Sequence, residues 1–200
     1  MVVPTSRWCS SPTSPRSSPA PCCTDSSSRR PARRRWPDVR AAHPEASLYV
    51  VGEGPLEHEL AGLDGVRLLG RREDVPLLLR WADLYVSASA AEGLSNALLE
   101  AMASGLPCVV TDVGGVADVL SQGVDGRIVA AGPGDRPIDD LVAEITTLLN
   151  DPDAGYALGK AARSSVRSGS SITATVMALA AQYRDLAGDR VWADETRSTR

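Results

Sequence analysis

The sequence predicts an α/β fold: a Rossmann-like parallel sheet with helices on both faces, preceded by a disordered or irregular tail. Short apolar segments that end in Gly, Ser or Asp alternate with helical patterns from Val39 onward. Strands that alternate with helices are typical of parallel sheets covered on both sides. Residues 4–37 consist mostly of Ser, Pro and Arg and show neither a helical nor a strand period. We therefore predict a tail over residues 1–38, a folded domain over 39–187 and a C-terminal tail over 188–200.

The predicted strands are short runs rich in Val, Leu and Ile, each closed by a residue that favours turns. They read SLYVVGEG at 47–54, GVRLLGR at 65–71, ADLYVSAS at 82–89, LPCVVTDVGG at 106–115 and GRIVAAG at 126–132. Helical patterns separate them at 55–63, 74–82, 95–105 and 115–123. Two longer helical patterns follow at 137–153 and 173–188. Acidic residues after Pro137 mark a helix start, because negative charge stabilises a helix N-terminus.

Composition and charge argue against several function classes. The net charge of -4 gives no reason to expect nucleic acid as a partner. No apolar run is long enough to span a bilayer, and the N-terminus lacks the apolar centre of a signal peptide, so we expect a cytoplasmic location. The four cysteines form no C-x-x-C pair and the chain has two histidines, so we expect no metal and no cofactor. Cys108 lies in a predicted strand, where an inert core thiol is expected.

Ligands of open parallel sheets bind beyond the carboxyl ends of the strands. These ends lead into loops rich in Gly, Ser or acidic residues at 52–55, 70–74, 87–95 and 112–115. After the third loop, Ser95 is a good N-cap for a helix. The N–H groups of Asn96, Ala97 and Leu98 would then favour a phosphate or diphosphate, together with the helix dipole. Gly93 would let such a ligand approach the backbone closely.

Two carboxylates, Glu92 and Glu100, flank this helix start eight positions apart. Beside a diphosphate they would repel the phosphates, but they can accept hydrogen bonds from a ribose diol and from a hexose. The spacing alone leaves two other interpretations open. Asn96, Glu100 and Ser104 share one helical stripe that can simply face water. Glu92 can be a loop carboxylate without a function.

Three segments carry a more specific pattern. They are VVGEGPLEHEL at 50–60, the run from VRLLG to DGRIV at 66–129, which contains EGLSNALLEAMASG, and LLNDPDAGYALGKAAR at 148–163. Together, from about Val39 to Leu186, they resemble the C-terminal, donor-binding domain of group 1 (family-4-like) retaining glycosyltransferases, which is one half of a GT-B fold. The resemblance implies transfer of a sugar from a nucleotide-sugar donor to an acceptor with retention of anomeric configuration.

The resemblance also implies a role for individual residues. Glu92, the candidate catalytic residue, would bind the hydroxyls of the donor sugar, and Glu100 would bind the ribose. The backbone of Gly93, Leu94 and Ser95, continuing into Asn96, would hold sugar and diphosphate. The loop that contains Gly52 and Gly54 would border the nucleotide, although tight turns explain these glycines as well. The backbone of Arg72, Glu73 and Asp74 would meet the base.

The sequence departs from this family pattern at two points. It shows no acceptor-binding half. It also lacks the Arg and Lys that in the family offset charge on the departing diphosphate, and a Ser/Pro/Arg-rich segment stands in their place. One hypothesis is a glycosyltransferase that needs a second chain or a charge clamp not recognisable in this sequence, and the alternative is a truncated donor-domain remnant that binds nucleotide-sugar without turnover. A sugar-nucleotide epimerase fits the motif less well. The acceptor would be a sugar, a lipid or a small molecule, and any peripheral membrane contact would come from the missing half.

The abrupt change of composition also suggests that residues 4–37 translate a shifted reading frame. A frame slip in GC-rich DNA yields an excess of Arg, Pro, Ser, Ala and Cys, as this segment shows. A natural disordered tail on a truncated paralogue is the alternative.

Overall fold

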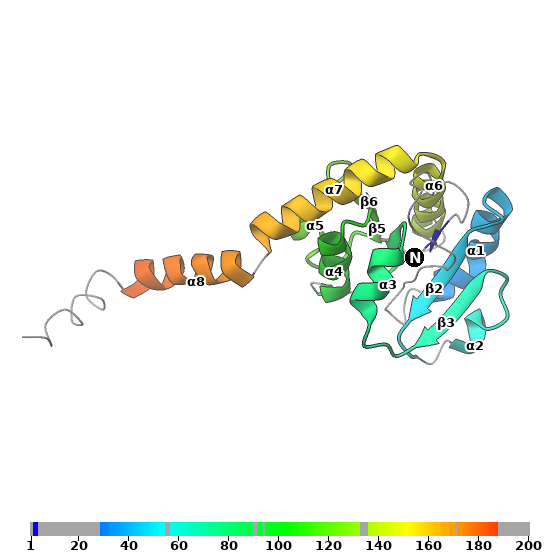
Figure 1. Cartoon of the computed structure of the whole chain (residues 1–200), viewed down its shortest axis with the longest axis horizontal. Helices are drawn as coiled ribbons and strands as arrows, with labels where there is room; N and C mark the ends of the chain where they lie inside the picture. The colour runs from blue at the N-terminus through cyan, green and yellow to red at the C-terminus, as the bar shows by residue number, and fades with distance from the viewer. Residues whose placement is uncertain are drawn as a thin grey trace, which may run out of the picture.

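The computed structural model describes residues 2–3, 29–54, 57–89, 92–93, 95–132, 136–170 and 172–187 (Figure 1). The strands are β1 (Val2–Val3), β2 (Ser47–Val51), β3 (Val66–Gly70), β4 (Tyr85–Ser87), β5 (Cys108–Thr111) and β6 (Arg127–Val129). The helices are α1 (Arg29–Ala42), α2 (Glu57–Leu60), α3 (Val75–Trp81), α4 (Asn96–Ser104), α5 (Val116–Val119), α6 (Arg136–Asn150), α7 (Pro152–Gly169) and α8 (Ile172–Ala187). From β2 to β6 strands and helices alternate, which confirms the predicted α/β class.

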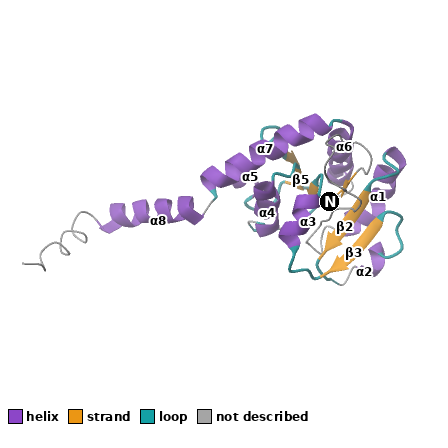
Figure 2. Ribbon diagram, in the orientation of Figure 1, coloured by secondary structure: helices purple, strands orange, loops and turns teal. Residues whose placement is uncertain are grey.

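The strands form two sheets of three, in the orders β1-β2-β3 and β4-β5-β6. The pairs β2–β3, β4–β5 and β5–β6 are parallel, whereas β1 runs antiparallel to β2 with Val2 opposite Leu48. Figure 2 shows both sheets with helices around them. The parallel pairing agrees with the sequence prediction, and the division into two sheets is a feature that the strand patterns did not predict.

Alternation along β5 places helices on both faces of the second sheet. The side chains of Cys108 and Val110 are buried in a cluster with Leu98 and Met102 of α4. Val109, between them, is buried in a second cluster with Leu141 and Ile145 of α6. Successive side chains of a strand point to opposite faces, so each face of β5 has its own core. Cys108 is fully buried, as its position in a predicted strand indicated, and its thiol donates a hydrogen bond to the carbonyl of Leu106 at 3.4 Å.

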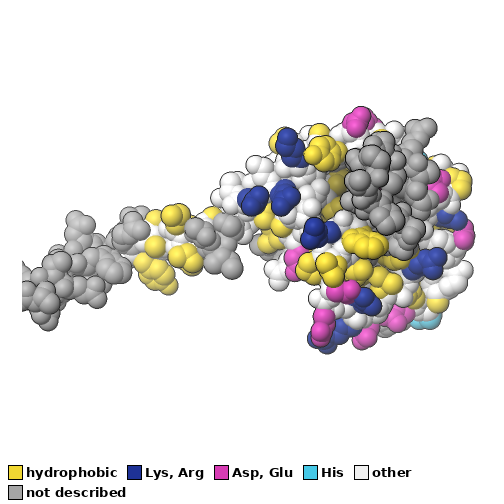
Figure 3. Space-filling model, viewed as in Figure 1, with side chains coloured by type: hydrophobic (Ala, Val, Ile, Leu, Met, Phe, Trp, Pro, Cys, Tyr) yellow, Lys and Arg dark blue, Asp and Glu magenta, His cyan; other side chains and the backbone are white. Residues whose placement is uncertain are grey.

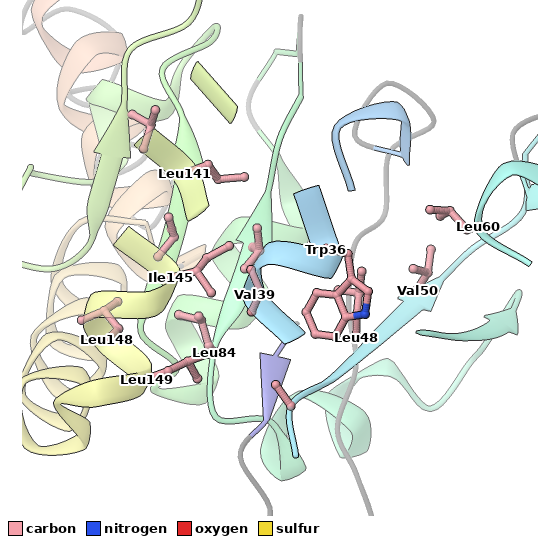
Figure 4. Close-up of a cluster of buried hydrophobic side chains, with 14 of the residues drawn as sticks. Trp36, Val39, Leu48, Val50, Leu60, Leu84, Leu141, Ile145, Leu148 and Leu149 are labelled. Atoms are coloured by element: carbon pink, nitrogen blue, oxygen red, sulfur yellow. The ribbon is translucent and has the colours of Figure 1, made fainter. Parts of the chain in front are cut away.

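The second cluster joins the two sheets and helix α1 (Figure 4). Trp36 of α1 is 4% exposed and its indole Nε1 donates a hydrogen bond to the carbonyl of Asp64 at 2.7 Å. Arg35 pairs with Asp139 of α6 at the surface. The expected boundary between residues 38 and 39 therefore falls inside α1, and the prediction that residues 4–37 lack a packed core is wrong for Trp36. The composition of this segment did not indicate that Trp36 is buried, because its nearest neighbours in the sequence are mostly Pro and Arg.

The last helix, α8, extends away from the α/β body and contacts α7 (Figure 1). Several of its apolar side chains are exposed, among them Val176, Met177, Leu179 and Tyr183, and hydrophobic side chains on this helix are visible in Figure 3. In the described part of the chain, no helix is both long and apolar enough to cross a membrane. The predicted tails lie mainly outside the described residues, so their boundaries stay predictions.

Candidate functional site

The connection from β4 to α4 contains the motif that the sequence analysis singled out. Ser95 is the N-cap of α4, as predicted, and its Oγ accepts a hydrogen bond from the N–H of Leu98 at 3.4 Å. Gly105 ends the helix in a left-handed conformation with φ of 80°. Both ends of α4 are thus set by local residues. Leu94 lies outside the described residues.

The N-cap changes the set of donors expected at the start of α4. We predicted that the N–H groups of Asn96, Ala97 and Leu98 would all face a ligand. The hydroxyl of Ser95 already occupies the N–H of Leu98, because a serine N-cap binds one of the first free amides. Asn96 and Ala97 remain as the first-turn donors of this helix. The helix dipole adds a partial positive charge at the same end.

One buried hydroxyl group, that of Ser89, holds the Glu92 carboxylate, and two further hydroxyl groups contact Ser89. Ser89 Oγ donates to Glu92 Oε2 at 3.1 Å, and the same hydroxyl lies 3.1 Å from Ser87 Oγ. Thr111 Oγ1, at the end of β5, donates to the carbonyl of Ser89 at 2.6 Å. All three hydroxyl-bearing residues are buried, whereas Glu92 is partly exposed. Ser89, just after β4, therefore positions the carboxylate directly, and Thr111 at the end of β5 holds the backbone of Ser89.

Sequence reasoning missed these three hydroxyl residues. Ser87 and Ser89 sit at alternate positions of VSAS, where a buried strand ends, and Thr111 ends the next strand. Small hydroxyl residues at the carboxyl ends of adjacent strands were the available signal. The turn after β5 adds a backbone contact, because the N–H of Gly115 donates to the carbonyl of Gly93 at 3.2 Å.

The second carboxylate, Glu100, lies on α4 and is exposed, as is Asn96. Ser104 Oγ donates to the backbone carbonyl of Glu100 at 2.8 Å, which is a local helical bond. The stripe of Asn96, Glu100 and Ser104 is thus exposed or partly exposed to solvent. This fits both a ligand-binding stripe and a plain surface stripe. A shared pocket for Glu92 and Glu100 stays a prediction.

The glycines after β2 have structural partners. Gly52 has a φ of 102°, and its N–H donates to the carbonyl of Gly70 at 2.7 Å. The N–H of Gly54 donates to Glu57 Oε1 at 3.0 Å, which caps the start of α2. Both amides therefore serve the turn. This agrees with the tight-turn interpretation, and the carbonyl of Gly54 also serves the turn, because it accepts the N–H of Glu57 at 3.2 Å.

The loop after β3 is organised by an exposed ion pair. Arg72 Nε and Nη2 donate to the two carboxylate oxygens of Asp74 at 2.8 and 2.6 Å. The hydrogen bond from Arg72 is the main cause that lowers the pKa of Asp74 from its usual value, and the reciprocal bond raises the pKa of Arg72. Asp74 also begins α3, because its carbonyl accepts the N–H groups of Leu77 and Leu78. Glu73, between the pair, is exposed.

No cluster of three or more His, Cys, Asp or Glu side chains suited to a metal occurs among the residues that the structure describes. The site therefore offers the Glu92 carboxylate held by Ser89, the capped N-terminus of α4 and loops that contain glycine. Such an arrangement can bind hydroxyl groups and an anion side by side.

Comparison with known proteins places this site in a family. The family model described as "Glycosyl transferases group 1" matches residues 32–151, which is more than half of the chain. The match begins inside α1 and covers the whole Glu92 to Glu100 segment. It begins before Val39, so it also includes Trp36.

Similar curated proteins are glycosyltransferases of several kinds. The sulfoquinovosyl transferase SQD2 of Arabidopsis thaliana is 35% identical over 127 residues, which cover 60% of this chain and 24% of that protein. The N-acetyl-alpha-D-glucosaminyl L-malate synthase of Bacillus anthracis is 35% identical over 129 residues, covering 61% of this chain and 33% of the relative. The chain thus spans between a quarter and a third of the length of these two relatives.

Solved structures show the same fold at lower identity. The Anabaena protein HepE in complex with UDP-glucose matches with a TM-score of 0.66 and 22% identity, over 83% of this chain and 48% of that chain. Sucrose-phosphate synthase from Thermosynechococcus elongatus matches with a TM-score of 0.64 and 22% identity, over 84% of this chain and 45% of the other. At this level of identity the likeness concerns the fold.

Proposed function

Because this chain belongs to the group 1 glycosyl transferases, we propose that it is the donor-binding part of a glycosyltransferase that takes a sugar from a nucleotide-sugar and transfers it with retention of anomeric configuration. One arrangement supports this function above all: the Glu92 carboxylate is fixed by Ser89 beside the N-terminus of α4. A carboxylate accepts hydrogen bonds from sugar hydroxyls, and a helix N-terminus accommodates phosphate.

The proposed roles follow from charge. The donor diphosphate binds at the first-turn N–H groups of Asn96 and Ala97, where the helix dipole is positive. Glu92 binds the sugar hydroxyls, since direct contact with the phosphates would be repulsive. The exposed Glu100, one turn into α4, binds the ribose diol. Gly93, Leu94 and Ser95 contribute backbone groups to the sugar and the diphosphate.

The nucleotide lies between the two remaining loops in this proposal. The loop with Gly52 and Gly54 borders it, and the backbone of Arg72, Glu73 and Asp74 meets the base. The fold neighbour HepE has been solved in complex with UDP-glucose, which supports a nucleotide-sugar ligand for this fold. The identity of the base and of the sugar is a matter for the experiment below.

The chain spans 24% and 33% of two curated relatives, and we propose that transfer also needs an acceptor-binding half and a pair of cations outside the described domain. The second candidate function is a donor-domain remnant that holds nucleotide-sugar without transferring it. Removing a group that stabilises charge in the transition state typically costs about 3 kcal/mol.

The test is isothermal titration of the full chain with UDP-, GDP- and ADP-sugars and with the matching nucleoside diphosphates. We expect one nucleotide series to bind. Glu100→Ala should weaken both members of that series, whereas Glu92→Ala should weaken only the sugar-bearing ligand. Asp140→Ala removes an exposed helical carboxylate elsewhere and is the matched control. Absence of binding to every ligand would overturn the function, and an equal loss of plain nucleotide for both glutamate variants would overturn the division of roles.

A further inference from the structure

The backbone of the Glu92 loop lies directly against a glycine of the next strand–helix turn. Gly114, between β5 and α5, has a φ of 56°. A Cβ atom placed on it would lie 1.8 Å from the carbonyl oxygen of Glu92 and 2.6 Å from that of Gly93. These distances are far shorter than any van der Waals contact, and the neighbouring atoms are backbone, which cannot rotate aside as a side chain can.

The same turn also makes a hydrogen bond to the loop. The N–H of Gly115 donates to the carbonyl of Gly93 at 3.2 Å. Earlier in the loop, Thr111 Oγ1, at the end of β5, donates to the carbonyl of Ser89 at 2.6 Å. Hydrogen bonds from the last residue of β5 and from the turn after it therefore hold Ser89 and Gly93, on either side of Glu92 in the sequence.

We propose that Gly114 is a positioning residue for the donor sugar: by lacking a side chain, it lets the β5–α5 turn set where the Glu92–Gly93 backbone lies. This inference rests on the proposed function of Glu92 as the group that binds sugar hydroxyls. Gly114 itself need not touch the ligand. Its effect reaches the sugar through the position of the Glu92 loop.

The selectivity of this effect follows from what Gly114 approaches. Its nearest backbone atoms belong to Glu92 and Gly93, in the proposed sugar site. The proposed ribose ligand, Glu100, lies on α4, whose buried side chains Leu98, Ala101 and Met102 anchor it in the core. A displaced loop therefore moves Glu92 and its sugar contacts, whereas Glu100 and the N–H groups of Asn96 and Ala97 on α4 stay in place, so the sugar-bearing ligand should lose more than the diphosphate does through Gly93.

Gly62 offers a matched control. It has a φ of 83°, and a Cβ atom there would meet nothing within 4 Å. Gly62→Ala and Gly114→Ala share the cost of placing alanine in the left-handed region. Gly114→Ala alone adds the overlap with Glu92 and Gly93. A difference between the two variants therefore reports the close approach, with the backbone strain common to both.

The experiment compares these variants by titration with the sugar-nucleotide that the wild type binds and with its nucleoside diphosphate. For Gly114→Ala we expect a loss of about tenfold in affinity for the sugar-nucleotide, equivalent to one hydrogen bond to a charged group. Affinity for the nucleoside diphosphate should change by less than about threefold, a difference of well under one such bond. Gly62→Ala should bind both ligands as the wild type does. Equal losses of both ligands in Gly114→Ala would overturn the proposal.

A second variant and a second readout keep the test decisive. Thr111→Val removes the other constraint without adding volume, and it should give a smaller loss of the same selective kind. Amide chemical shifts of Glu92, Gly93 and Gly115 are measured without ligand, at a temperature where Gly114→Ala is folded. They should move in Gly114→Ala and stay unchanged in Gly62→Ala.

Unchanged shifts in Gly114→Ala, or a ligand loss in Thr111→Val that is equal for sugar-nucleotide and nucleotide, would refute the positioning role. Failure of the wild type to bind any sugar-nucleotide would instead refute the proposed function, and the shifts would still decide whether Gly114 positions the loop.

Discussion

The loop after β4 and the loop after β3 each connect a parallel strand to a helix, but they are held by different forces. The Glu92 loop is held by buried hydroxyls, by Thr111 and by the turn at Gly114 and Gly115. The loop after β3 is held by the exposed pair of Arg72 and Asp74. Water competes with the second kind of contact and is excluded from most of the first.

The difference shows that the Glu92 loop has the more rigid support of the two loops. A group that must meet a ligand in one orientation gains from support that does not rearrange, because ordering it on binding would cost entropy. A loop that meets a ligand through its backbone can tolerate a weaker restraint. We therefore expect the two loops to respond unequally to mutation, to loss of charge and to acid.

The largest effect is expected from Ser89→Ala. This change leaves the hydroxyl of Ser87 and the carboxylate of Glu92 without their shared buried partner. Loss of a buried hydrogen-bonding partner costs about 1–3 kcal/mol of unfolding free energy. Urea denaturation followed by circular dichroism measures it. A midpoint equal to that of the wild type would show that the hydroxyl contacts do not constrain the loop.

A smaller effect on stability, but a clear one on binding, is expected from Glu92→Gln. The amide keeps an oxygen that can accept the bond from Ser89, so the urea midpoint should remain close to that of the wild type. Affinity for a sugar-nucleotide should fall by about tenfold, because a neutral acceptor binds hydroxyls less strongly than a carboxylate. Titration calorimetry measures the change. A fall in stability without a fall in affinity would assign Glu92 a structural role.

Arg72→Ala provides the contrast on the other loop. The pair with Asp74 is exposed on both sides, so its removal should lower the urea midpoint much less than Ser89→Ala does. The measurement is the same denaturation series as for Ser89→Ala. A loss equal to that of Ser89→Ala would show that exposure does not separate the two loops.

The smallest expected effect is the acid response of that pair. The pKa of Asp74 is lowered in the folded protein by the hydrogen bond from Arg72. A lowered folded-state pKa means that the contribution of the pair is present above the ordinary carboxyl value and is lost as the pH falls through the folded value. The difference in thermal midpoint between the wild type and Asp74→Asn should therefore shrink towards low pH. A difference that grows on acidification would reverse the sign of the shift.

Local features of the site were predictable from the sequence, and features that join distant segments were not. The N-cap role of Ser95 follows from its residue type and from the helical pattern of the nine residues after it. The bond from Thr111 to the Ser89 carbonyl joins residues that are 22 positions apart, so no local pattern encodes it. The turn at Gly114 was visible as a turn, but the segment that presses on it depends on strand packing.

The fold shows the same division. Alternating strands and helices predicted the α/β class because the pattern is repeated along the chain. Helix α1 escaped the prediction because Trp36 and Val39 carry its contact with the core cluster among polar neighbours, and Pro37 lies inside the helix. Pairing of Trp36 with the Asp64 carbonyl depends on a segment 28 positions away. Two buried side chains three positions apart are too few to establish a helical period in a sequence.

The alternation along β5 has a consequence for how the domain comes apart. Val109 belongs to one buried cluster, Cys108 and Val110 belong to the other, and Thr111 at the end of the strand grips the Glu92 loop. Separating this strand from its neighbours would expose both clusters in the same event. The two cores should therefore melt in a single cooperative transition, and hydrogen exchange at the amides of β5 should require opening of the whole unit. Because Thr111 of β5 also contacts the Glu92 loop, the amide hydrogens of the site should exchange as slowly as those of the strand.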